Sequence, residues 1–170
     1  NAFALMAVGG VDQNQRKADS IHRPFILTRS FFAGQQRYGA HTWSGDVGSS
    51  WQSFRAQVPL CLNHTLCANP NVNTDIGGFF ANAYNRTYLD NTGTNNPQFQ
   101  ELYVRWMQFG LFTPMMRSHG TEVYREFYYY GKPGEPVYDA LLDAVKMRYR
   151  LLPYIYSQSW QVSANDDSFM

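Results

Sequence analysis

Short apolar stretches that alternate with amphipathic helices are the feature that most limits how this chain can fold. Four such stretches are short enough for strands and are followed by charged or glycine-containing segments, as buried strands usually are. They lie at residues 25–28, 38–43, 69–76 and 115–119. Strands that alternate with helices are typical of a parallel sheet joined by crossover helices. The sequence therefore predicts the α/β class.

The helices between these stretches are predicted from spacing and from capping residues. Residues 1–17 carry apolar positions of a short helix end, and residues 50–62 repeat apolar side chains at helical intervals. Asn96 followed by Pro97 is a good helix start, because Asn caps well and Pro suits the first helical position. A last helix begins at Pro136 and runs through Arg148, and Pro153 ends or kinks it. Residues 81–96 are polar and predict a surface loop.

Composition excludes several classes of protein. Hydrophobic residues make up 44% of the 170 residues and charged residues 16%, so the chain is not intrinsically disordered. The 14 Lys and Arg residues nearly balance the 13 Asp and Glu residues, which gives no electrostatic footprint for nucleic acid or an anionic membrane. No apolar run approaches the roughly 20 residues of a membrane span. Two cysteines, Cys61 and Cys67, make neither a disulfide framework nor a zinc site.

Each predicted strand ends in a polar cluster. The residues concerned are Arg29, Asp46, Asp75 and His119. In a (β/α)8 barrel the catalytic residues lie at the carboxyl ends of the strands. The sequence contains no Gly-rich phosphate loop, Ser-His-Asp series or metal-binding cluster, so we expect neither a metal nor an organic cofactor.

Each of the four has a structural alternative. Asp46 beside Trp43 could have a raised pKa and act as a general acid, but local sequence alone favours a cap for the following helix. Asp75 before Gly77-Gly78 could meet a ligand or stabilise a turn. Arg29 could bind a carboxylate of a ligand or form an ion pair with Asp46 or Asp75. A lone histidine such as His119 is more often structural.

The aromatic residues divide in the same way. Trp43, Phe79 and Phe80 lie in loops at the predicted site, where flat rings can stack on sugars. The helical spacing instead predicts core positions for the rings of the helices, and the tyrosine run is more typical of packing. The core set is Trp51, Phe54, Trp106 and Phe109, and the run is Tyr128, Tyr129 and Tyr130. Two carboxylates at a site that can stack sugars suggest glycoside hydrolysis.

Seven ordered motifs resemble a known family. They are Arg-Pro-Phe-Ile-Leu-Thr-Arg-Ser (23–30), Gln-Arg-Tyr-Gly-Ala-His (36–41), Trp-Ser-Gly-Asp (43–46), Asn-Thr-Asp-Ile-Gly-Gly-Phe (73–79), Glu-Leu-Tyr-Val-Arg-Trp-Met-Gln (101–108), Met-Arg-Ser-His (116–119) and Tyr-Arg-Leu-Leu-Pro-Tyr-Ile-Tyr (149–156). In this order and spacing they resemble glycoside hydrolase family 31, which holds α-glucosidases and α-xylosidases. The form of the Asp46 motif and the linker at 131–136 look most like bacterial α-xylosidases of that family.

The resemblance implies a partial (β/α)8 TIM barrel. Residues 1–170 would be the second half of the catalytic barrel, approximately strands five to eight with their helices, and no complete domain. The activity implied is retaining hydrolysis of terminal non-reducing α-linked glycosides, with an oligosaccharide as substrate. A periplasmic or secreted location is suggested by the bacterial members, while the oligomeric state stays open.

The resemblance also assigns roles to residues. Asp46 becomes the general acid/base, which reverses the preference for a helix cap. Arg29 and His119 would bind sugar hydroxyls, and Asp75 would be a polar support with Arg117 beside it. The two loop rings at 43 and 79 would line the sugar site.

The chain departs from the family pattern at three places. The nucleophile of the family lies in a Trp-x-Asp segment at the end of strand four, and no such segment occurs in these residues. Thr42 separates His41 from Trp43, and Val47 follows the acid where Asn is common. We therefore expect the isolated chain to be inactive. A truncated, non-catalytic carbohydrate-binding remnant is the alternative to an enzyme.

Overall fold

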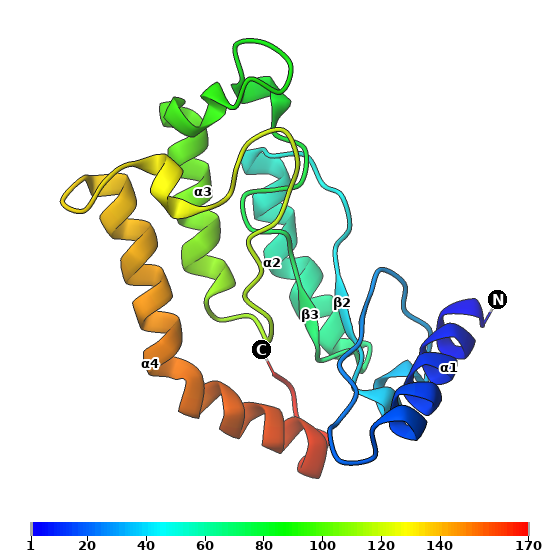
Figure 1. Cartoon of the computed structure of the whole chain (residues 1–170). Helices are drawn as coiled ribbons and strands as arrows, with labels where there is room; N and C mark the ends of the chain where they lie inside the picture. The colour runs from blue at the N-terminus through cyan, green and yellow to red at the C-terminus, as the bar shows by residue number, and fades with distance from the viewer. Residues whose placement is uncertain (1, 170) are drawn as a thin grey trace.

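The computed structural model describes residues 2–169, in which four helices surround a small sheet (Figure 1). The helices are α1 (Phe3–Ala18), α2 (Trp51–Leu66), α3 (Pro97–Gly110) and α4 (Pro136–Asn165). The strands are β1 (Leu27–Thr28), β2 (His41–Trp43) and β3 (Val72–Asn73). Short 3-10 turns stand at Gln35–Tyr38, Asn82–Tyr84, Thr92–Asn95 and Phe127–Tyr130.

The sheet is parallel throughout, in the order β1-β2-β3. Leu27 lies opposite His41, and Thr42 lies opposite both Thr28 and Val72. Helix α2 makes the crossover from β2 to β3, which a parallel pair requires. The predicted α/β class is confirmed.

The fourth predicted strand, at 115–119, is reduced to a bridge. Ser118 pairs in parallel with Ile76, whose N–H donates to the carbonyl of Arg117 at 3.0 Å. Pairing is interrupted after this bridge, because Gly77 and Gly78 have φ angles of 92° and 78° and turn the backbone away, and it resumes as the parallel Phe80–Thr121 bridge. The predicted strand at 69–76 is likewise reduced, to β3 and the Ile76 bridge.

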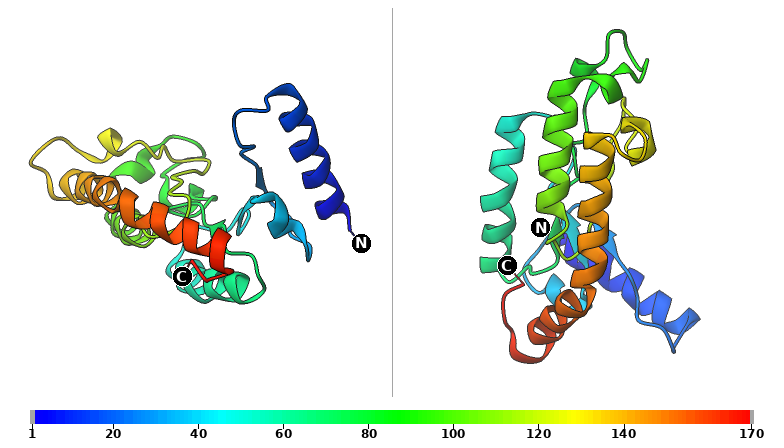
Figure 2. Two further views of the ribbon diagram at one scale, coloured as in Figure 1. Left: turned by 90° about the horizontal axis from the view of Figure 1, so that it is seen from below. Right: turned by 90° about the vertical axis from the view of Figure 1, so that its left-hand side faces the viewer.

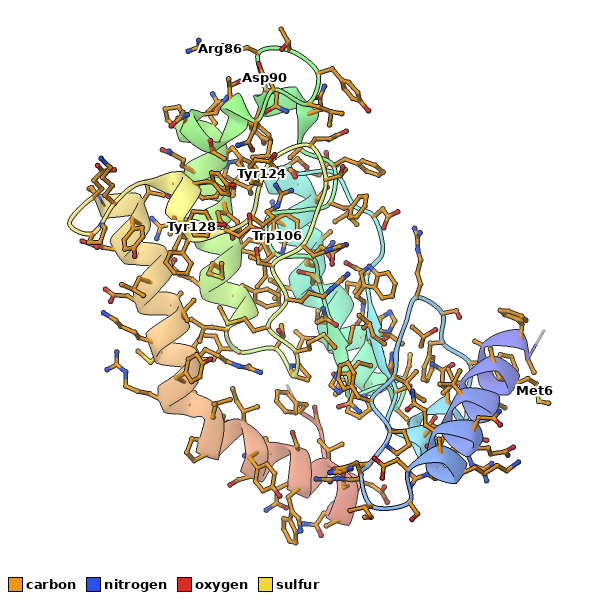
Figure 3. All side chains as sticks on the ribbon, in the orientation of Figure 1. Met6, Arg86, Asp90, Trp106, Tyr124 and Tyr128 are labelled. Atoms are coloured by element: carbon orange, nitrogen blue, oxygen red, sulfur yellow. The ribbon has the colours of Figure 1, made fainter. Side chains whose placement is uncertain are left out.

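Helix α3 carries the main core. Its start is as predicted, since the Asn96 side chain accepts from the N–H groups of Gln98 and Phe99 and Pro97 is the first helical residue. Trp106 has no exposed surface, stacks on Phe54 of α2 at 5.0 Å between ring centroids, and lies between the two helices in Figure 3. A buried indole N–H needs a partner. The Trp106 Nε1 finds one in Thr74 Oγ1 at 2.6 Å, so α3 is fixed to the end of β3.

One predicted core position, Trp51, is wrong, and the tyrosine run packs in the core only at its end. Trp51 is 49% exposed, because it is the first residue of α2 and Phe54 fills the space against Trp106 and Phe109. In the tyrosine run only Tyr130 packs in the core, with its ring 4.7 Å from that of Tyr103. Tyr128 and Tyr129 are exposed at the surface.

Helix α4 continues through Pro153 instead of ending there. Figure 1 shows the helix changing direction in its second half, as expected where proline removes an internal hydrogen bond. Before the bend, Leu141 and Ala144 pack into the core. Arg148 donates to the carbonyls of Leu111, Thr113 and Pro114, which ties α4 to the turn that follows α3.

The remaining segments lie at the edges of this body. Figures 1 and 2 show α1 apart from the other helices, on the other side of the strands. It packs through Val8 against Ile26, Ala40 and Tyr38, a second and smaller cluster. The loop 81–96 projects at one end of the molecule, where Figure 3 labels Arg86 and Asp90. None of the helices within residues 2–169 is long and apolar enough to cross a bilayer.

Helix α2 is capped by Ser50, whose Oγ accepts from the N–H of Ser53 at 3.0 Å, and not by Asp46. We expect Ser50→Ala to lower the free energy of unfolding by about 1 kcal/mol, because an N–H in the first turn of the helix loses its partner. Asp46→Asn is the matched control and leaves the cap intact. Urea denaturation measures both, and an equal loss in the two variants would contradict this assignment of the cap.

Candidate active site

The predicted site residues gather at one edge of the sheet. Arg29 directly follows β1, Asp46 comes three residues after β2, and Asp75 comes two residues after β3. Because parallel strands end at the same edge, all three leave the sheet on one side. His119 follows the Ser118 bridge and joins them there.

Backbone hydrogen bonds hold the loops beyond these strands in the same order as the strands. The N–H of Phe79 donates to the carbonyl of Val47 at 2.7 Å, and the N–H of Thr121 donates to the carbonyl of Phe79 at 2.8 Å. The loop of Phe79 therefore lies between the loop of Asp46 and the loop of His119. This order gives the site a framework that extends past the end of the short strands.

Asp46 is the more accessible of the two carboxylates. Its side chain is 32% exposed, and its Oδ2 lies 3.4 Å from Nη1 of Arg29, which is 61% exposed. The ion pair that the sequence offered as an alternative for Arg29 is thus present. An exposed pair of this kind contributes at most about 1 kcal/mol, so both side chains can exchange partners with a polar ligand.

Asp75 is completely buried. Its Oδ1 lies 2.5 Å from Nη1 of Arg117, and its Oδ2 has no hydrogen-bond partner among residues 2–169. Burial raises the pKa of Asp75 to about 6. The Arg117 charge opposes this rise, the Asp46 charge adds to it, and the Arg125 charge opposes it.

Arg117 joins the buried carboxylate to an aromatic wall. Its Cζ lies 5.3 Å from the centre of the Trp43 ring, within the range of a cation–π contact. The Nε1 of Trp43 is buried without a partner in the described part of the chain. Side chains from β2, from the end of β3 and from the 115–119 segment thus meet in one row.

Phe79 and His119 form a second group beside this row. Their ring centroids are 5.6 Å apart at a tilt of 47°. Burial lowers the pKa of His119, and the charges of Arg117 and Arg125 lower it further. The ring is therefore neutral near pH 7, when it can both donate and accept a hydrogen bond. His119 also lines a cavity of about 480 Å³ formed mostly by residues 118–126.

Two residues of the 118–126 loop were missed by the sequence reasoning. Arg125 is only 8% exposed and donates through Nη2 to the carbonyl of Gly78 at 2.8 Å. Glu122 accepts through Oε2 from the N–H groups of Ala81 and Asn82 at 2.7 and 2.5 Å. Neither has a local signal in the sequence, because both act on a loop some 40 residues away. The arrangement as a whole offers carboxylates, cations and flat rings to a ligand rich in hydroxyl groups.

Residues 1–158 match the family model described as "Glycosyl hydrolases family 31 TIM-barrel domain". The chain belongs to glycoside hydrolase family 31. The resemblance based on the motifs is thereby confirmed, and so is the relation of the small parallel sheet to a TIM barrel.

Individual members of family 31 are similar over nearly the whole chain. An alpha-xylosidase of Saccharolobus solfataricus is 40% identical over 163 residues, which are 94% of this chain and 20% of that protein. The crystal structure of a family 31 alpha-xylosidase from Xanthomonas citri superposes with a TM-score of 0.90 at 38% identity, covering 99% of this chain and 18% of that one. A family 31 alpha-glucosidase from Bacteroides thetaiotaomicron has a TM-score of 0.79 at 34% identity, covering 97% and 25%. The chain thus spans about a fifth of the length of such relatives.

The buried Asp75 predicts a specific dependence of stability on pH. In the folded protein its carboxyl keeps a proton up to about pH 6, whereas its ordinary pKa is 3.8. The stability that Asp75 contributes is therefore present below pH 4 and is lost as the pH rises to 6, by about 3 kcal/mol in total. Asp75→Asn should remove this part of the pH dependence, which urea denaturation between pH 4 and 7 measures.

The control for this measurement is Asp143→Asn, since Asp143 is exposed on α4. It should keep the pH dependence of the wild type. If Asp75→Asn and the wild type lose stability in parallel between pH 4 and 6, Asp75 is not the group that titrates there.

Proposed function

We propose that the intact protein hydrolyses terminal non-reducing α-linked glycosides, with α-xylosides and α-glucosides as the substrate classes. The observation that carries this proposal is the pair of carboxylates at one sheet edge, one partly exposed and one buried, among aromatic rings and arginines. Membership of family 31 supports it, as do the alpha-xylosidases that are 40% and 38% identical. Residues 1–170 would form the second half of the catalytic barrel.

Asp46 is the general acid/base in this proposal. A carboxyl group in this role must reach both the glycosidic oxygen and the water that attacks later. Asp46 is partly exposed, and within residues 2–169 its ion pair is with the exposed Arg29. It would first protonate the leaving oxygen and then take a proton from water, so that the configuration at the anomeric carbon is retained after two displacements.

Asp75 has a supporting role, because its buried position prevents it from acting as the general acid/base. It is completely buried, and Arg117 holds one of its oxygens. Its Oδ2 is buried as well, so Asp75 would act through Arg117 and not by direct contact with the sugar. The pair with Arg117 would also keep the Trp43 ring in place as a wall of the sugar site.

The other site residues complete a pocket for one neutral sugar. Arg29 and His119 would bind hydroxyl groups, since both are exposed at the site, Arg29 as a cation and His119 as a ring beside Phe79. Phe79 would supply the second flat wall. Sugar pockets combine a few polar partners with such apolar walls.

In the intact protein, Asp46→Ala should lower kcat/KM by about 10²- to 10⁴-fold on α-xylosides with poor leaving groups, because they need a proton on the departing oxygen. The loss should be much smaller on an α-xyloside with an activated aryl leaving group. Steady-state kinetics on both substrates tests this, with the exposed Asp143→Asn as control. Equal losses on the two substrates would contradict the acid role.

The 170 residues alone should not hydrolyse aryl α-xylosides or α-glucosides, because the nucleophile of the family pattern is not among them. A sensitive fluorogenic assay of the isolated chain measures this. Turnover that disappears in Asp46→Asn would contradict the expectation. An intact protein that binds the sugar without any turnover would instead support the carbohydrate-binding remnant.

A further inference from the structure

Arg125 is a buried cation directly behind the candidate active site. It comes from the 118–126 loop and is 8% exposed. Its Nη2 donates to the carbonyl of Gly78 at 2.8 Å, its Nη1 donates to the carbonyl of Val123, and its Cζ lies 5.0 Å from the centre of the Phe99 ring. A guanidinium of this kind loses most of its water, so its place needs a physical explanation.

No carboxylate within residues 2–169 lies at salt-bridge distance from Arg125. Its Nε is buried without a hydrogen-bond partner in the same range. Burial lowers the pKa of Arg125, and the neighbouring Tyr130, Tyr103 and Asp75 oppose that shift. The positive charge is therefore not cancelled locally, and its field extends into the site.

The backbone is shaped to admit this side chain. A Cβ atom at Gly120 would overlap Nη2 of Arg125, and a Cβ at Gly77 would lie 3.4 Å from its Nε. These glycines belong to the two loops that carry Phe79 and His119. Arg125 occupies the space between the loops, and only glycine at 120 permits so close an approach.

The residues that Arg125 contacts are direct neighbours in sequence of the proposed sugar-binding residues. Gly78, whose carbonyl Arg125 holds, precedes Phe79, and Gly120 follows His119. The two loops are also joined by the hydrogen bond from the N–H of Thr121 to the carbonyl of Phe79. A shift of the guanidinium would therefore move both rings that lie 5.6 Å apart.

We propose that Arg125 is a positioning residue of the glycosidase site, which fixes Phe79 and His119 and supplies a buried positive charge to Asp75 and His119. This inference rests on the proposed function. Arg125 lines the same cavity as His119, but no hydrogen bond, ion pair or ring contact within residues 2–169 joins its side chain to Phe79 or His119, so it acts through these neighbours. It adds a residue that neither the motifs nor the strand-end pattern had identified.

The positive charge of Arg125 changes the pKa of Asp75 and of His119 in the same direction. Asp75 faces Arg117, Asp46 and Arg125, and both arginines lower its pKa. His119 faces the same three groups, and both arginines lower its pKa while Asp46 raises it. Loss of the Arg125 charge should therefore raise the pKa of both groups, and protonation of the site should begin at a higher pH.

The test compares Arg125→Met, which removes charge and hydrogen bonds, with Arg125→Lys, which keeps the charge but not the planar fork. In the intact protein we expect Arg125→Met to lower kcat/KM on an aryl α-xyloside by about 100-fold and to move the acid limb of its pH profile to higher pH. Arg125→Lys should lose about tenfold, with the acid limb where the wild type has it.

Arg148→Met is the matched control, because Arg148 also binds backbone carbonyls but lies away from the site. It should lower the thermal midpoint without moving the pH profile. An acid limb unchanged in Arg125→Met would overturn the inference. If Arg125→Met does not fold, wild-type kcat/KM in Arg125→Lys overturns it, and a tenfold loss at an unchanged thermal midpoint supports it.

A titration separates this inference from the proposed function. His119 is one of four histidines, so its carbon-13 signal in a histidine-labelled sample is assigned by its loss in His119→Asn. The pKa of His119 should be higher in Arg125→Met than in the wild type and unchanged in Arg148→Met. A wild type without turnover would end the proposed function, whereas an equal His119 pKa in wild type and Arg125→Met would end the role of Arg125.

Discussion

Parallel pairing of β2 between β1 and β3 is the constraint on which the rest of the structure depends. It forces the chain to return through a crossover after each strand, which α2 provides between β2 and β3. It also brings Arg29, Asp46 and Asp75 to one edge although they are far apart in sequence. The strands themselves are only two or three residues long, so the arrangement is stabilised mainly by the core of α3, which Trp106 connects to the end of β3.

The difference in burial between Asp46 and Asp75 suits these two chemically identical side chains to different roles. Asp46 and Asp75 each have an arginine, but the Arg29–Asp46 pair is open to solvent while Asp75 has no exposed surface. In water the first pair is weak and exchangeable. In the interior the second pair is expensive to break, because a lone charge would remain. The accessible carboxylate is thus the one suited to proton transfer, and the enclosed one is suited to support.

Local signals predicted more of this fold than of its site. The start of α3 needs only Asn96 and Pro97, so the sequence alone located it. The predicted length of the fourth strand is wrong, because that length depends on the turn at Gly77, which lies in another segment. Strand-end reasoning found Asp46 and Asp75 for a topological reason. The same reasoning did not identify Arg125, since its importance comes from two loops that meet only in the folded chain.

The charges around the site also bear on what completes it. Arg29 is exposed and Arg117 is paired with Asp75, whereas Arg125 is buried with no carboxylate at salt-bridge distance within residues 2–169. Buried cations are costly unless an anion lies near, and a neutral sugar supplies none. The retaining mechanism proposed above needs a second carboxylate about 5–5.5 Å from the general acid/base. The uncompensated charge of Arg125 thus favours a further carboxylate near the site, in keeping with that mechanism.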